Sequence, residues 1–89
     1  MNVEELKRRA ITFEEELKAI CDQSPEATAF AKYEPIVEVI RRAKAGQIVG
    51  PEQIPGMHYW HFETEILWKY EAMAEAFSRF SLLLSGLER

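Results

Sequence analysis

The sequence predicts an all-α fold, and three features indicate this class. Apolar residues recur at alternating steps of three and four, the spacing that places side chains on one side of a helix. No stretch shows the apolar–polar alternation of a half-buried strand, because Val and Ile are scattered at helical spacing. A chain of 89 residues is long enough for one domain with one core. We therefore expect residues 1–89 to form one small antiparallel bundle of three helices.

The first helix is predicted from residue 2 to about residue 20. Asn2 and Glu5 have the spacing of a capping box, and acidic residues there suit the positive end of the helix dipole. Three acid–base pairs lie four residues apart in the favourable order, namely Glu4–Arg8, Glu5–Arg9 and Glu14–Lys18. The predicted core-facing stripe is Val3, Leu6, Ala10, Phe13, Leu17 and Ile20.

A second helical segment is predicted from Ser24 to Gly46, with a kink or a break near Pro35. Serine followed by proline is a start signal, because Ser24 can cap the helix and Pro25 is tolerated in its first turn. Pro35 removes a backbone donor, so the segment is expected to kink there or to divide into two helices meeting at Glu34. Gly46 can adopt the left-handed conformation that ends a helix. The predicted apolar stripe is Phe30, Tyr33, Ile36, Val37, Ile40 and Ala43.

The sequence GQIVGPEQIPG, residues 46–56, is predicted to be a loop because of its glycine and proline content. Its apolar residues Ile48, Val49 and Ile54 indicate that it packs onto the helices. A long, continuous third helix is then predicted from about Met57 to Leu84, with Gly86 able to end it. Its predicted core-facing stripe is Tyr59, Phe62, Ile66, Tyr70, Met73, Phe77, Phe80, Leu84 and Leu87.

The stretch PGMHYWHFETEILWKY, residues 55–70, concentrates aromatic side chains that one helix face cannot all bury. On a continuous helix, three large apolar residues of this stretch fall away from the core stripe. Either the 46–56 loop folds back over the tryptophans, or these residues form an exposed patch of the kind that binds proteins. The candidate protein-interaction residues are Trp60, Leu67 and Trp68.

Catalytic and metal-binding patterns are weak in this sequence. His58, His61 and Glu65 could approach one another on a helix, but the HExxH order of zinc enzymes is missing. Cys21 is expected to pack as a small apolar residue and Lys69 to extend toward solvent. We therefore expect no metal, no cofactor and no catalytic residue. Three serines at helical spacing are expected to form a small-residue face against a neighbouring helix: Ser78, Ser81 and Ser85.

The charge balance narrows the functional classes. The formal net charge is −4, and the 15 acidic and 11 basic residues are interleaved, which disfavours binding to nucleic acid. The chain has one cysteine and no apolar run near the roughly 20 residues that span a bilayer, so a reducing cytoplasm is the expected location. The sequence therefore favours a non-enzymatic interaction module, such as an adaptor, inhibitor or immunity-type protein, acting as a homodimer or with another protein.

Two alternatives stay open. A small dimeric all-helical enzyme of the size of the chorismate mutases would need several arginines or lysines facing inward, and the first apolar stripe has none. No motif of that family is visible. A weak nucleic-acid-binding protein is the second alternative, and its support is limited to the basic residues Arg41 and Arg42.

Overall fold

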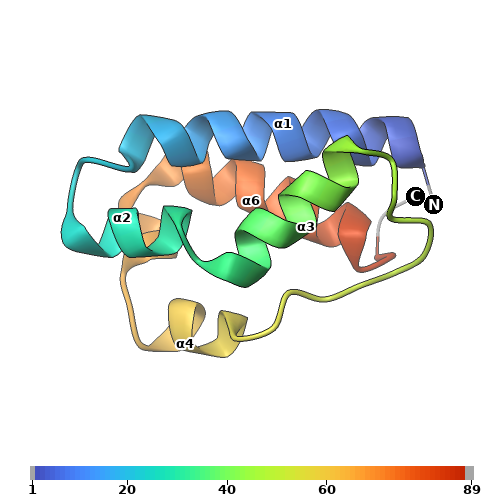
Figure 1. Ribbon diagram of the computed structural model, residues 1–89. Helices are drawn as coiled ribbons and strands as arrows, with labels where there is room; N and C mark the ends of the chain where they lie inside the picture. The colour runs from blue at the N-terminus through green and yellow to red at the C-terminus, as the bar shows by residue number, and fades with distance from the viewer. Residues whose placement is uncertain (1, 88–89) are drawn as a thin grey trace.

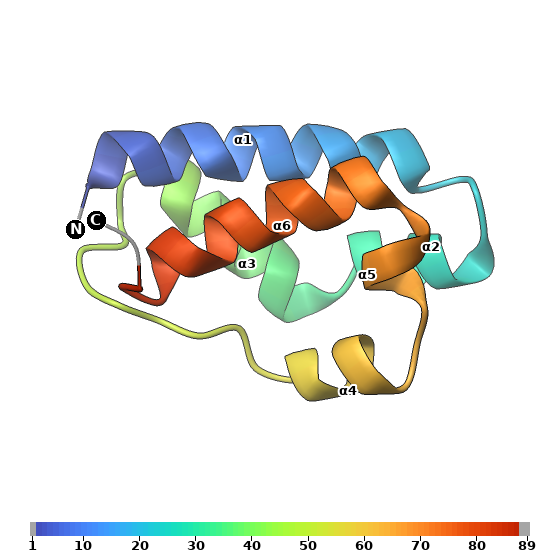
Figure 2. The same cartoon turned by 180° about the vertical axis from the view of Figure 1, so that it is seen from behind.

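The computed structural model describes residues 2–87 and shows an all-α fold (Figures 1 and 2). The predicted class is confirmed, and no strand occurs among these described residues. Six helices follow one another along this part of the chain, instead of the expected three: α1 (Val3–Ile20), α2 (Pro25–Ala31), α3 (Glu34–Lys44), α4 (Met57–Phe62), α5 (Ile66–Lys69) and α6 (Glu71–Leu84).

The core lies where α1 packs along α6 and α3 (Figures 1 and 2). Phe13 of α1 is fully buried, and its ring centroid lies 5.4 Å from that of Phe77 and 5.7 Å from that of Phe80 on α6. The stripe predicted for the first helix is buried as expected, except that Val3 is half-buried. In both views α4 lies on the side of the molecule opposite α1, with α3 and α6 between them.

The predicted helix ends are confirmed where local chemistry specifies them. Asn2 caps α1 by accepting a hydrogen bond from the Glu5 backbone N–H at 3.1 Å, and Ser24 caps α2 in the same way. Gly46 has a φ of +71° after α3, and Gly86 has +81° after α6. After each glycine the next backbone N–H bonds to a carbonyl five residues earlier, a pattern that favours glycine at these positions.

The predicted break near Pro35 is confirmed as two separate helices. α2 ends at Ala31, and α3 begins at Glu34 with Pro35 in its first turn, where the missing N–H has no intrahelical partner to lose. The break also changes which side of α3 faces the core. Val39 is buried, whereas Val37, predicted to be buried, is 49% exposed.

The prediction of one continuous third helix is wrong. α4 ends at Phe62, and α5 begins at Ile66 after a bend at residues 63–65. Thr64 provides a physical reason, because its hydroxyl donates to the Trp60 carbonyl at 2.6 Å and accepts from the Ile66 N–H at 3.4 Å. Such local side-chain bonds compete with the helical backbone ladder. A second interruption at Tyr70 separates α5 from α6.

The bend at residues 63–65 accompanies a reversal of the burial predicted for the aromatic residues of α4. Trp60 is 7% exposed, and its ring centroid lies 4.9 Å from that of Phe30 and 5.6 Å from that of Tyr33. Tyr59 and Phe62, predicted to be buried, are 55% and 73% exposed. Trp60 therefore faces the core, whereas Tyr59 and Phe62 on the same helix do not. The rest of the predicted stripe is buried from Ile66 through Leu84, apart from the half-buried Tyr70, whereas Leu87 is exposed.

The 46–56 segment is tied to the helices by both apolar and polar contacts. Its residues Ile48 and Ile54 are buried as predicted, whereas Val49 is exposed. Arg42 of α3 donates two hydrogen bonds to the Glu52 carboxylate, at 2.8 and 2.5 Å. The Glu52 backbone N–H donates to the Leu84 carbonyl at 2.9 Å, and the Tyr33 hydroxyl donates to the Pro55 carbonyl at 2.8 Å. These bonds hold the loop at both α3 and α6.

Replacing Trp60 by alanine tests its role as the anchor of α4. The Trp60→Ala variant should lose about 3–5 kcal/mol of unfolding free energy, because a large buried ring leaves a cavity against Phe30 and Tyr33. The matched variant Tyr59→Ala should lose about 1 kcal/mol or less, since Tyr59 is largely exposed. Urea unfolding followed by circular dichroism measures both. Equal losses would contradict the anchoring role.

The Arg42–Glu52 pair predicts a dependence of stability on pH. Its hydrogen bonds and charge hold the pKa of Glu52 below the ordinary glutamate value of 4.5. A lowered pKa in the folded chain means that the ionised carboxylate stabilises the fold above pH 4.5 and that this contribution disappears as the pH falls through the folded-state value. Glu52→Gln should therefore lower the urea midpoint near neutral pH and lose stability less steeply in acid. A pH dependence as steep as that of Glu63→Gln, an exposed control, would contradict this.

Candidate protein-interaction surface

Three large aromatic side chains project from α4 and α5 into solvent. Tyr59 is 55% exposed, and Phe62 and Trp68 are each 73% exposed. All three lie within ten residues of chain, counted from Tyr59 to Trp68. We call this group, Tyr59, Phe62 and Trp68, the aromatic edge.

Two buried side chains set the orientation of the aromatic edge. Trp60 holds α4 against Phe30 and Tyr33, and Ile66 is fully buried at the start of α5. Both helices are very short, so burying one side chain of each turns its neighbours outward. The exposed rings are thus carried on backbone that is anchored within the same turn.

The three residues predicted from the sequence do not form one exposed patch. Trp60 is buried, Leu67 is half-buried against the core, and Trp68 presents most of its side chain to solvent. The continuous-helix register placed Trp60 and Leu67 on one line, and the bend at residues 63–65 removes that register. Tyr59 and Phe62 were missed for the same reason. Thr64 after an aromatic run was the available signal, because threonine favours local bonds to the backbone.

The exposed Glu and Lys residues that neighbour the aromatic edge in the sequence are mostly acidic. Four exposed charged residues lie in or directly after this stretch of the chain, and we call them the rim of the aromatic edge: Glu63, Glu65, Lys69 and Glu71. Lys69 is exposed, as its predicted extension toward solvent requires, and its Nζ lies 5.6 Å from the centroid of the Tyr70 ring. With three carboxylates and one ammonium, the rim carries a net negative charge near neutral pH.

The histidines pack against aromatic rings. The His58 ring centroid lies 4.7 Å from that of Phe62, and the His61 centroid lies 5.9 Å from that of Phe77. α4 ends before Glu65, so the helical spacing that would have brought Glu65 to His61 is lost. Within residues 2–87, no three His, Cys, Asp or Glu side chains are grouped closely enough to hold a metal ion.

The serine face expected to pack against a neighbouring helix is instead open. Ser81 of α6 and Ser85, the residue directly after α6, line a hollow of about 250 Å³ whose opposite wall includes Glu52, Met57 and His61. Ser78 is exposed. Among the described residues, this side of α6 therefore faces the irregular 52–56 segment and, across the hollow, Met57 and His61 of α4.

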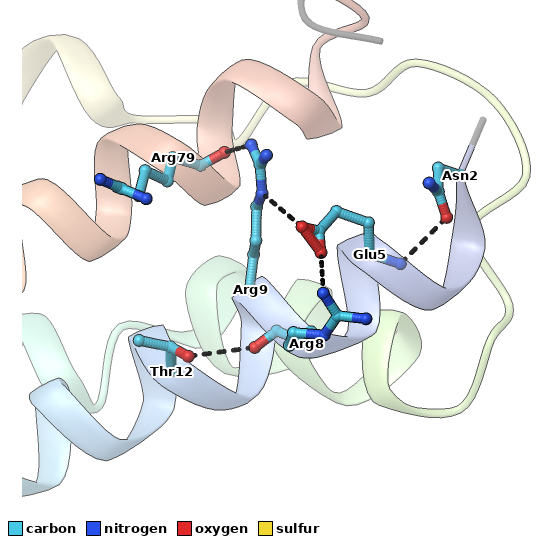
Figure 3. Close-up of polar contacts among 6 residues, drawn as sticks. All are labelled: Asn2, Glu5, Arg8, Arg9, Thr12 and Arg79. Carbon is cyan, nitrogen blue, oxygen red and sulfur yellow. Dashed lines mark hydrogen bonds and ion pairs between the residues drawn. The ribbon is translucent and has the colours of Figure 1, made fainter.

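Two basic residues of α1, Arg8 and Arg9, are engaged with other protein atoms (Figure 3). Arg8 donates to the Glu5 carboxylate at 2.9 Å, and Arg9 lies 3.7 Å from the same group. Arg9 also crosses to α6, where it donates to the Arg79 carbonyl at 2.9 Å (Figure 3). The cluster therefore joins α1 to α6.

Two further properties concern the residues that the structure describes. No polar or charged residue from 2 to 87 is buried, so the core offers no inward-facing arginine or lysine. None of the helices in this range has the length and apolar composition needed to cross a membrane.

The two tryptophans should report the two environments separately. In a Trp60→Phe variant the remaining Trp68 should emit at long wavelength and be quenched strongly by iodide, because its ring is mostly in water. In a Trp68→Phe variant the remaining Trp60 should emit at shorter wavelength and resist quenching. Equal quenching of the two variants, with folding verified by circular dichroism, would show that α4 does not bury Trp60.

Comparisons with protein-family models, curated proteins and solved structures find no match for this chain.

Proposed function

We propose that this chain is a non-enzymatic helical protein-interaction module, of the adaptor, inhibitor or immunity type, and that the aromatic edge binds its partner. The observation that carries the proposal is the exposure of Tyr59, Phe62 and Trp68 in one short stretch. Exposed aromatic side chains grouped in this way are typical of protein interfaces, where Trp and Tyr supply much of the binding energy.

The anchoring of α4 and α5 supports this proposal. Trp60 and Ile66 are buried directly beside the exposed rings, so the edge is presented by backbone that is already ordered. A binding surface that is ordered before association loses less conformational entropy when the partner arrives. Leu67, half-buried against the core, adds apolar area next to Trp68.

The charge around the edge favours a partner other than a second copy of this chain. Two copies meeting edge to edge would bring their surplus carboxylates, Glu63, Glu65 and Glu71, close to one another. The three rings also present only about 300–500 Å² of apolar surface. A stable interface buries about 800 Å² on each partner, so a homodimer would need additional surface. We therefore propose a partner with an apolar centre and a basic rim.

Charge substitutions in the edge test the proposal. Phe62→Glu and Trp68→Glu should each weaken partner binding at least tenfold, because each replaces an exposed ring at the interface by a carboxylate. Val49→Glu is the matched control, since Val49 is 78% exposed and lies in the loop that precedes α4. A partner captured by the wild-type chain would be purified and its affinity for each variant measured by calorimetry.

Light scattering over a concentration series tests self-association with the same variants. A dimer that persists in Val49→Glu and dissociates in both edge variants would identify a second copy as the occupant. Equal binding by the edge variants and the control, with circular dichroism unchanged, would overturn the proposal.

A further inference from the structure

A groove of about 420 Å³ lies between α3 and the end of the 46–56 segment. This volume is within the roughly 300–1,000 Å³ of typical ligand sites. The groove shares no residue with the aromatic edge. Its lining residues are Glu34, Pro35, Glu38, Val39, Arg42, Glu52, Gln53, Ile54 and Pro55.

The inner wall of the groove is apolar. Val39 of α3 is 4% exposed and Ile54 of the loop is 9% exposed, so both belong to the edge of the core. Pro35 and Pro55 add rigid apolar surface from the two sides. The position of the loop wall is set by Arg42–Glu52 and by the bond from Tyr33 to Pro55. The groove is therefore held open by the fold itself.

The rim is acidic. Three carboxylates, from Glu34, Glu38 and Glu52, line the groove against one guanidinium, from Arg42. Arg42 donates two hydrogen bonds to the Glu52 carboxylate, so its charge is already paired within the chain. Glu38 receives two bonds from Arg41, at 3.2 and 2.5 Å. These arginines lower the pKa values of Glu38 and Glu52, so both carboxyls are ionised near neutral pH.

Glu34 differs from the other two carboxylates. It is exposed at the first position of α3, and its carboxylate has no hydrogen bond or ion pair with any residue from 2 to 87. Glu38 lies one helical turn further along α3, and both side chains line the groove. The rim therefore has an uncompensated negative charge beside an apolar wall.

We propose that this groove binds an extended peptide segment of another protein through an arginine side chain. The guanidinium lies between Glu34 and Glu38, and its methylene stem packs on Val39 and Ile54. Arginine fits better than a neutral residue because its planar fork donates to two carboxylates while its stem covers apolar surface. A peptide suits the groove better than a rigid protein face, because the lining is concave and bounded by α3 and the loop.

Titration with a pair of matched peptides tests the proposal by nuclear magnetic resonance. The probes are acetyl-Ala-Arg-Ala-amide and the same peptide with citrulline, a neutral isostere of arginine. The arginine peptide should shift backbone amide signals of residues 34–42 and 52–54 with a dissociation constant of about 1 mM, as expected for a ligand this small. The citrulline peptide should bind at least threefold more weakly, and added salt should reduce the difference.

Two glutamate variants complete the test. Glu34→Gln should weaken binding of the arginine peptide about three- to fivefold, as expected for one exposed charge pair. Glu4→Gln is the matched control, because Glu4 is exposed in the first turn of α1, as Glu34 is in the first turn of α3, and it belongs to neither proposed surface. It should bind like the wild-type chain. Both variants should keep the wild-type spectrum away from the substituted residue.

Several results would overturn the proposal: no saturable shifts, shifts centred outside the groove, equal affinity for the two peptides, or equal affinity of Glu34→Gln and Glu4→Gln. None of these results depends on the aromatic edge. The groove proposal can therefore be overturned while the aromatic-edge proposal holds. The aromatic-edge proposal can equally be overturned while the groove proposal holds.

Discussion

The packing of Trp60 against Phe30 and Tyr33 is the contact on which the arrangement of the last third of the chain depends. Its burial determines which side of α4 faces the core, and the Thr64 hydroxyl then occupies the Trp60 carbonyl and helps to end the helix. From that bend the chain reaches Ile66, which anchors α5 in turn. The exposed rings of the aromatic edge are a consequence of these two buried residues.

The 46–56 segment connects the two proposed binding surfaces. It leaves α3, is held by Arg42 and Tyr33, and passes Leu84 of α6 before it enters α4. Gly56 is needed at the end of this path, because its φ is +80° and an added Cβ would lie 1.9 Å from the Tyr33 hydroxyl oxygen. The same polar contacts that position α4 also form one wall of the acidic groove, so both surfaces depend on a correctly placed loop.

The arginine-rich end of α3 has two different roles. Arg42 reaches across to Glu52 and fixes the loop, whereas Arg41 bonds to Glu38 on its own helix. Basic residues also suit the negative end of the helix dipole, which is where both arginines lie. In this way the two arginines that gave limited support to the nucleic-acid-binding alternative contribute to tertiary structure and to the electrostatics of the groove.

Much of the architecture follows from neighbouring residues. The helical class, the caps at Asn2 and Ser24, the division near Pro35 and the glycine at residue 46 each depend on local chemistry, and periodicity shows the core side of α1. Whether residues 57–84 form one helix depended on long-range packing as well as on the local bonds of Thr64. Apolar spacing favours a helix, but it does not weigh the burial of one tryptophan against the rings beside it. Because Phe30 and Tyr33 come from a distant part of the chain, only the folded structure decides that Trp60 is buried and Phe62 is exposed.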